Sequence, residues 1–250
     1  MKILVIAAHP DDEVLGCGGT IAKHIRDGDE VHVVIMAEGV TSRSQQRDRS
    51  VNASELSELA DAAHAANKIL GVTSITLMDF PDNRMDSLDR LDVIKDVEKL
   101  VQAHTPTIVY THHIGDLNID HRRIHEAVVT ACRPVPGQPV LTLLFFEIAS
   151  NTEWQPPSSV SVFSPNWFVD ISETFDQKLE ALRAYQSEMR PWPHARSVEA
   201  LEHLARWRGA TVGVSAAEAF ILGRNIIKAS ELNVHVSPGE GENVRITHKT

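Results

Sequence analysis

The sequence predicts a single α/β domain built on a Rossmann-like, mostly parallel sheet with helices on both faces. Two observations support this fold class. Short apolar runs alternate with longer helical segments through the first half of the chain, and no linker or internal repeat divides it. At 250 residues with 42% hydrophobic side chains, the chain can bury one large core.

Each predicted strand is a short apolar run, and the strands fall at residues 2–7, 31–36, 75–78, 107–111 and 140–146. The predicted helices have apolar residues at helical spacing or are rich in Ala, Leu and Glu, and they fall at residues 15–27, 53–70, 89–104, 119–132, 176–189 and 198–208. Gly28 and Gly71 mark the ends of the first two helices, because glycine readily adopts the left-handed conformation that closes a helix.

The second half of the chain is less regular, and its proline-rich stretch 155–165 is predicted to be a loop. Residues 1–225 make up the predicted domain. The polar, weakly patterned residues 226–250 are expected to form a loosely packed C-terminal extension.

Composition argues against several classes of function. The net charge of -10, from 24 basic and 34 acidic residues, argues against nucleic acid as the main partner. No run approaches about 18 uncharged apolar residues, so no membrane span is expected, and residues 1–8 lack the pattern of a signal peptide. Two cysteines are too few for a disulfide framework, so a cytoplasmic location is expected. The oligomeric state stays open, and a homo-oligomer is compatible with the sequence.

Ligands of open α/β sheets bind beyond the carboxyl ends of the strands. That rule selects the segments 8–13, 37–49, 79–87 and 111–121. The first of them reads Ala-His-Pro-Asp-Asp-Glu. An imidazole and two carboxylates at the end of a buried strand can hold a metal ion and place a base beside it. The alternative is that the carboxylates only cap the following helix, whose N-terminus attracts negative charge.

Residues 111–125 favour the metal interpretation, because they place four histidines and two aspartates after a predicted strand at the same sheet edge. A catalytic zinc usually takes three protein ligands and leaves one position open. His9, Asp12 and one histidine of this segment would supply such a set. For any single histidine here, the alternative is an ordinary surface residue.

The chain resembles a known family at these residues. The run His9-Pro10-Asp11-Asp12-Glu13, with the glycine-rich stretch behind it, is similar to the signature of the LmbE/PIG-L-like deacetylases, and Asp120-His121 matches their second metal motif. Supporting similarities lie at residues 82–86, 147–154, 193–197 and 217–220, so the resemblance covers roughly residues 1 to 225. These enzymes are zinc-dependent and remove acetyl groups from N-acetylglucosamine-type amides.

The resemblance implies the roles of individual residues. The zinc ligands would be His9, Asp12 and His121, and Asp11 would be the general base. Asp120 would orient a neighbouring group. The substrate side would include residues from the 82–86 segment and two other positions, namely Asp82, Asn83, Arg84, Asn118 and His194.

Two departures from the family pattern stand out. Many members carry a histidine three residues before the second metal histidine, where this chain has Asn118. His113 is the preferred source of the missing imidazole, with His112 and His194 as alternatives. Some members also carry an arginine at the position matching Leu59, and the candidate replacements are Arg43, Arg47, Arg49 and Arg84.

The sequence therefore predicts an N-deacetylase that depends on zinc, or on another divalent metal ion in its place. Its substrate is an amino sugar or its conjugate, such as a sugar nucleotide, a glycan intermediate or a glucosamine conjugate. One alternative is a metal hydrolase of another amide or ester. A second is a non-catalytic nucleotide-binding protein, because Gly16-Cys17-Gly18-Gly19 lies near a helix start. That run lacks a full dinucleotide fingerprint, and close packing of the helix on the sheet explains it better.

Overall fold

A computed structural model of the chain describes residues 1–157 and 161–228. In this part of the chain, one seven-stranded sheet has the order β3-β2-β1-β4-β5-β7-β6. The strands are β1 (Lys2–Ala7), β2 (Glu30–Ala37), β3 (Ser74–Phe80), β4 (Ile108–His112), β5 (Thr142–Phe146), β6 (Trp167–Asp170) and β7 (Ala217–Asn225). The first five strands pair in parallel, so the predicted mostly parallel α/β sheet is confirmed.

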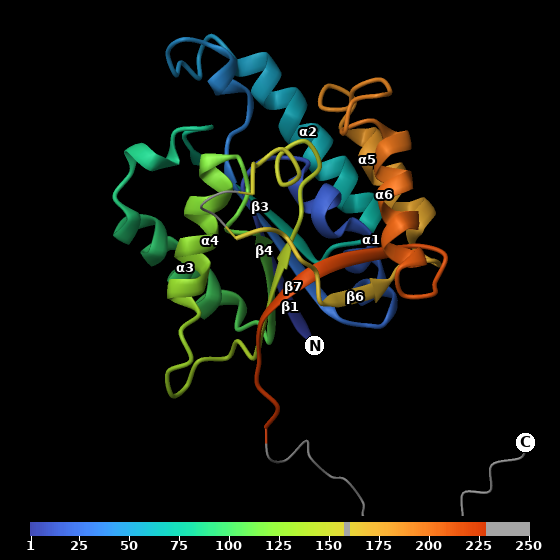
Figure 1. The fold of residues 1–250 in the computed structure, drawn as a ribbon. Coiled ribbons are helices and arrows are strands. Elements are labelled where there is room, and N and C mark those ends of the chain that lie inside the picture. The colour runs from blue at the N-terminus through green and yellow to red at the C-terminus, as the bar shows by residue number, and fades with distance from the viewer. Residues whose placement is uncertain (158–160, 229–250) are drawn as a thin grey trace, which may run out of the picture.

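Helices cover both faces of the sheet (Figure 1). They are α1 (Asp12–Arg26), α2 (Ala53–Leu70), α3 (Arg90–His104), α4 (Ile119–Ala131), α5 (Phe175–Ala184) and α6 (Val198–Ala210), with short 3-10 turns η1 (Val40–Arg43) and η2 (Met85–Ser87). Alternate residues of β1 divide the core between the two faces. Ile3 and Val5 pack in the cluster that includes α1, α2, α5 and α6, whereas Leu4 and Ile6 pack with α3 and α4.

Two strands and two helix ends differ from the sequence prediction. β7 pairs antiparallel with β5, and β6 pairs antiparallel with β7. Neither strand was predicted, because β6 is only four residues long and β7 is stabilised by partners far away in the sequence. The helix predicted at 176–189 ends at Ala184, where Tyr185 leaves the helical conformation. The helix predicted to begin at residue 15 begins at Asp12.

The glycine-rich run packs α1 closely against its neighbours. A Cβ atom at Gly16 would lie 2.5 Å from the Phe146 ring, and one at Gly19 would lie 2.7 Å from Ile171. The helix is interrupted at Cys17. Beyond this break, the Glu218 carboxylate accepts hydrogen bonds from the backbone N–H groups of Gly19 and Thr20, at 2.9 and 2.7 Å. The expectation of close packing is therefore confirmed.

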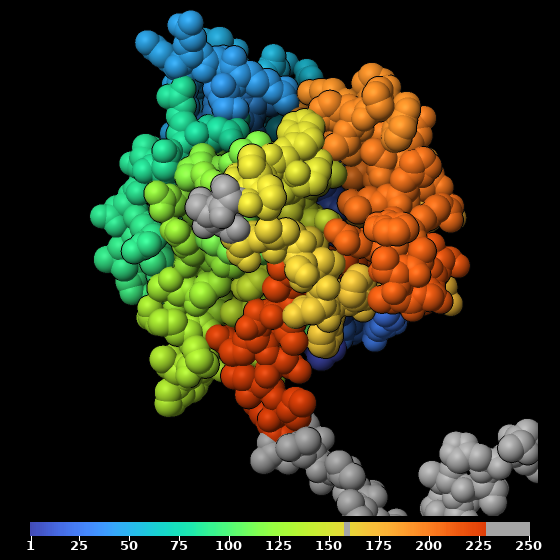
Figure 2. All heavy atoms as spheres, in the orientation of Figure 1, coloured from blue at the N-terminus to red at the C-terminus, as the bar shows by residue number. Residues whose placement is uncertain are grey.

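Residues 147–157, which follow β5, reach the loop after β4, where the Thr152 hydroxyl donates to Asp116 Oδ2 (2.9 Å). Figure 2 shows yellow residues of this part of the chain in the upper part of the molecule, next to an orange region. In the described part of the chain, no helix is long and apolar enough to span a membrane. Both cysteines are free and buried; the cytoplasmic location stays a prediction. The C-terminal extension was predicted for residues 226–250. Residues 229–250 lie outside the described part of the chain, so the extension stays a prediction.

Candidate functional site

The candidate site begins at the tight turn between β1 and α1. The Asp12 N–H donates to the His9 carbonyl oxygen (3.2 Å), and the His9 N–H donates back to Asp12 Oδ2 (2.9 Å). Asp11 takes a positive φ of 113° to complete the turn. Above it lies a cavity of about 200 Å³ that is open to solvent.

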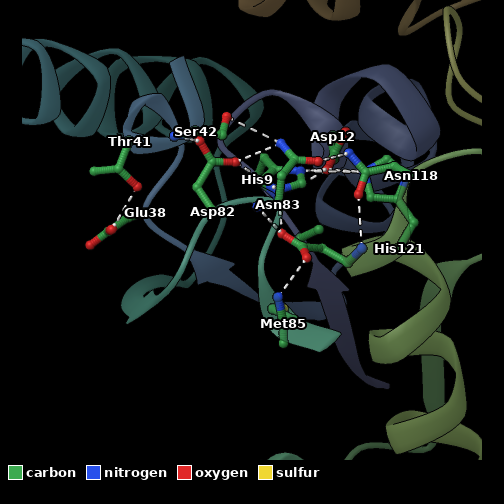
Figure 3. A network of polar contacts seen from close by, with 12 residues as sticks. His9, Asp12, Glu38, Thr41, Ser42, Asp82, Asn83, Met85, Asn118 and His121 are labelled. Carbon is green, nitrogen blue, oxygen red and sulfur yellow. Dashed lines mark hydrogen bonds and ion pairs between the residues drawn. The ribbon is translucent and has the colours of Figure 1, made fainter. Parts of the chain in front are cut away.

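Three side chains from two strand ends converge at this turn (Figure 3). His9 Nδ1 lies 3.3 Å from Asp12 Oδ2, His121 Nε2 lies 3.1 Å from the same oxygen, and the two ring nitrogens are 3.3 Å apart. His9 and Asp12 come from the turn after β1, and His121 comes from the first turn of α4, which follows β4. The structure thus brings together the three residues that the sequence analysis took as metal ligands.

This arrangement fits a tetrahedral zinc ion. Metal–ligand bonds of about 2.0–2.1 Å require ligand atoms about 3.3–3.4 Å apart, close to the three observed separations. The second oxygen of Asp12, Oδ1, is buried and has no hydrogen-bond partner among the described residues. A buried carboxylate oxygen without a donor is costly unless a cation neutralises it.

The local electrostatics also favour a cation. Burial by itself raises the pKa of Asp12, but the adjacent His121 outweighs it and holds that pKa well below the usual value. Burial lowers the pKa of His121, yet Asp12 and Asp116 outweigh it and raise the value to about 9. When neighbouring carboxylates raise the pKa of a histidine, their negative charge also favours a divalent cation, which can take the place of the proton.

A second group of potential ligands shares His9 through its other ring nitrogen. His9 Nε2 lies 3.0 Å from Asp120 Oδ2 and 3.3 Å from Asp82 Oδ1. The carboxylates of this second group already accept hydrogen bonds from other groups. Asp120 accepts from the backbone N–H groups of Asn83 (2.6 Å) and Met85 (3.0 Å), and Asp82 Oδ2 accepts from Ser42 N–H (2.9 Å).

These contacts suit a supporting role for Asp120. A metal-binding histidine commonly donates its second N–H to a carboxylate, which fixes the ring. Asp116 lies behind His121 in a similar way, with its Oδ1 3.1 Å from His121 Nδ1, but the angle of this contact falls outside hydrogen-bond geometry. Asp116 is itself held by Asn118 N–H (2.8 Å) and the Thr152 hydroxyl (2.9 Å). Asp120 was predicted from the sequence as a site residue, whereas Asp116 was not, although it lies in the same histidine-rich segment.

Asp11 lies next to Asp12 in the same turn and forms an ion pair with Arg196. Its Oδ2 accepts from Arg196 Nη1 at 2.7 Å, and its Oδ1 is buried without a partner in the described ranges. Burial raises the pKa of Asp11 well above its usual value, against the opposing charge of Arg196. Arg196 was not predicted as a site residue; its only signal was the motif at 193–197.

The predicted substrate residues divide into two groups. Asp82, Asn83 and Asn118 line the cavity, and Asn118 Nδ2 donates to Asn83 Oδ1 at 2.9 Å. Asn118 also caps α4 by accepting from Asp120 N–H (2.8 Å). Arg84 does not line the cavity; it donates to the Gln45 carbonyl oxygen (3.0 Å).

The three histidines considered as replacements for the missing imidazole lie outside the cavity lining. His112 stacks on His121 with ring centroids 3.9 Å apart, and its Nε2 accepts from Ala8 N–H (2.8 Å). His113 packs edge-on against Phe163. His194 accepts from Arg196 N–H (3.0 Å) and so helps to shape the turn that carries this arginine.

Strained backbone gathers around the cavity. In the described ranges, four non-glycine residues have positive φ angles, and the three near the site are Asp11, Asn83 and Ser150. Such conformations cost free energy and persist where surrounding contacts impose them, often at functional sites.

Comparison with known proteins agrees with this geometry. The sequence profile of the PIG-L family, described as GlcNAc-PI de-N-acetylase, matches residues 4–132, about half of the chain. The chain is 30% identical over 194 residues to YaiS, an uncharacterised deacetylase of Escherichia coli K12, covering 74% of this chain and 90% of that protein. It is 27% identical over 188 residues to a probable N-acetyl-α-D-glucosaminyl L-malate deacetylase of Bacillus cereus, covering 74% and 83%.

The fold is also shared with a protein of different activity. The crystal structure of GalB, the 4-carboxy-2-hydroxymuconate hydratase of Pseudomonas putida KT2440, superimposes with a TM-score of 0.71 at 22% identity, covering 91% of this chain and 98% of that one. This likeness establishes the fold alone. The profile match and the similarity to YaiS establish more: the chain belongs to the PIG-L family of de-N-acetylases, as the resemblance of its motifs predicted.

Proposed function

We propose that this protein is a zinc-dependent N-deacetylase that releases acetate from an N-acetylated amino sugar or its conjugate. The observation that carries the proposal is the triangle of His9, Asp12 and His121, with ligand atoms 3.1–3.3 Å apart, beside the buried carboxylate of Asp11. Family membership and the B. cereus relative support an acetylated glucosamine unit as the substrate class.

A zinc ion held by these three residues would polarise the acyl oxygen and increase the acidity of a nearby water. Asp11 then serves as the general base, and its free oxygen, Oδ1, accepts the proton of the attacking water. The same oxygen returns the proton to the nitrogen as the amide bond breaks, so that the amine leaves neutral. Asp120 holds the imidazole of His9 in place from behind, and Asp116 lies behind that of His121.

The cavity suits a ligand with many hydroxyl groups. Its lining is mostly polar and includes Ser42, Asp82, Asn83, Asn118, Asn151 and Glu188. Both arginines in the described lining are already ion-paired, since Arg43 donates to both oxygens of Glu188 (2.7 and 2.9 Å) and Arg196 pairs with Asp11. We therefore propose that the sugar is recognised through its hydroxyls, and that a phosphate on the substrate is not required.

The two alternatives differ in what supports them. A metal hydrolase of another amide or ester would use the same residues, and the fold shared with GalB leaves that choice to experiment. The nucleotide-binding alternative has less support. The backbone N–H groups of Gly19 and Thr20, which a phosphate would need, donate to the buried carboxylate of Glu218.

The test is acetate release from a panel of N-acetylglucosamine, its malate and nucleotide conjugates, diacetylchitobiose and simple N-acetyl amines and esters. We expect zinc-dependent acetate release from at least one N-acetylated amino sugar. Asp11→Asn should keep zinc but lose most turnover, because it removes a base and not a ligand. The matched control is Asp89→Asn, which makes the same substitution at an exposed helix cap. Acetate release only from simple amides or esters would contradict the proposal.

A further inference from the structure

The guanidinium of Arg196 is held by two residues in addition to its ion pair with Asp11. Its Nε donates to Ser150 Oγ at 2.8 Å. The Asn151 amide, oriented so that both its ends are satisfied, accepts from Arg196 Nη2 at 3.1 Å and donates to the Ser150 carbonyl oxygen at 3.0 Å. With Nη1 on Asp11 Oδ2 at 2.7 Å, each guanidinium nitrogen has a partner of its own.

Both segments that hold this guanidinium are themselves fixed. Ser150 is buried, takes a φ of 71°, and donates its N–H to Glu153 Oε1 (2.6 Å). The turn before α6 is closed by Arg190 N–H donating to the Arg196 carbonyl oxygen (3.2 Å). Ser197, the next residue, caps α6. The guanidinium is therefore a rigid part of the cavity wall.

Among the described residues, only one of the two carboxylate oxygens of Asp11 is engaged. Its Oδ2 is bound by Arg196, whereas its Oδ1 has no partner in the part of the chain that the structure describes. A planar guanidinium whose three nitrogens are all engaged is held in one orientation, so its contact with Asp11 fixes the position of Oδ2. A lysine could reach one oxygen but could not make the other two contacts.

We propose that Arg196, held by Ser150 and Asn151, is a positioning residue for Asp11. It binds Oδ2 and thereby presents Oδ1 to the proton that is transferred during the reaction. This inference rests on the proposed function, in which Asp11 is the general base. It assigns a role to the motifs at 147–154 and 193–197, which neither metal binding nor the base explains.

The test compares Arg196→Ala with a matched control, Arg208→Ala. Arg208 also makes a two-point ion pair, with Glu147 at 2.8 and 2.7 Å, and its side chain is 20% exposed against 19% for Arg196. For Arg196→Ala we expect kcat to fall on the order of 100-fold, as for a misplaced catalytic group, with a much smaller change in KM and unchanged zinc content. Added guanidinium ion should restore much of the lost kcat, and Arg196→Lys should be intermediate.

A fall in kcat no larger than that of Arg208→Ala would overturn the proposal, and so would a failure of guanidinium to rescue. If Arg196→Ala does not fold, Asn151→Leu and Ser150→Ala loosen the same guanidinium, and each should lower kcat with little change in KM. A crystal structure of the folded variant gives a readout that is independent of activity. Asp11 should leave its present orientation; an unchanged Asp11 would refute the inference even if the protein deacetylates amino sugars. Absence of deacetylation in the wild type would instead refute the proposed function.

Discussion

Replacing Asp120 with asparagine tests the carboxylate that holds His9 from the side opposite the ligand triangle. Asp120 Oδ2 lies 3.0 Å from His9 Nε2 and accepts from Asn83 N–H, while Oδ1 accepts from Met85 N–H. An asparagine has only one acceptor oxygen. In either amide orientation, its NH₂ group faces a donor that the carboxylate now satisfies.

The expected magnitude follows from these contacts. If the amide oxygen keeps His9 and Asn83, the buried N–H of Met85 is left without a partner, which costs about 1–3 kcal/mol of unfolding free energy. The imidazole also loses a charged partner, and such losses behind a metal ligand typically weaken metal binding by about 10–100-fold. That range corresponds to about 1.4–2.8 kcal/mol of binding free energy.

Zinc affinity can be measured by competition with a chelator of known affinity, and the unfolding free energy by urea titration of the metal-free protein. Asp89→Asn is the control, because it removes the same charge at an exposed cap where asparagine serves as well. If Asp120→Asn binds zinc as tightly as Asp89→Asn does, the Asp120 carboxylate does not support the metal site.

Three further predictions concern stability. Lys178→Met leaves the Glu218 carboxylate buried without its cation and should cost about 3–5 kcal/mol in urea unfolding; a loss below about 1 kcal/mol would contradict this. Burial lowers the pKa of His113 from 6.5 to about 4, so the unfolded chain takes up the proton first. The wild type should therefore lose stability relative to His113→Asn as the pH falls from about 6.5 to about 4. Parallel curves of unfolding free energy against pH for the two proteins would contradict the lowered pKa of His113. Chelation should lower the Tm and abolish activity, zinc should restore both, and an unchanged Tm would argue against a resident metal.

The sequence predicted the parts of the site that follow from strand ends. Continuous apolar runs located the parallel strands, and the rule that their carboxyl ends meet at one edge placed His9 next to the histidine-rich segment 111–125. The family resemblance then selected His121 from that segment. Asp120 was found because it adjoins His121 in a recognisable motif. Asp116 was missed, because its relation to His121 depends on how the loop before α4 folds back, and no periodicity encodes that.

Arg196 illustrates the limit of sequence reasoning more clearly. It reaches Asp11 across 185 residues of sequence, through a turn and a loop with no regular pattern. β7 was missed for a related reason. It pairs with β5 across about 80 residues, and its stability comes from that pairing and not from its own alternation of polar and apolar residues.

Anomalous X-ray diffraction at the zinc edge, on crystals of the zinc-loaded protein, tests the central claim most directly. We expect one anomalous peak within about 2.0–2.2 Å of His9 Nδ1, Asp12 Oδ2 and His121 Nε2. A peak located instead between His9 Nε2, Asp82 and Asp120, or no peak at either group, would contradict the account.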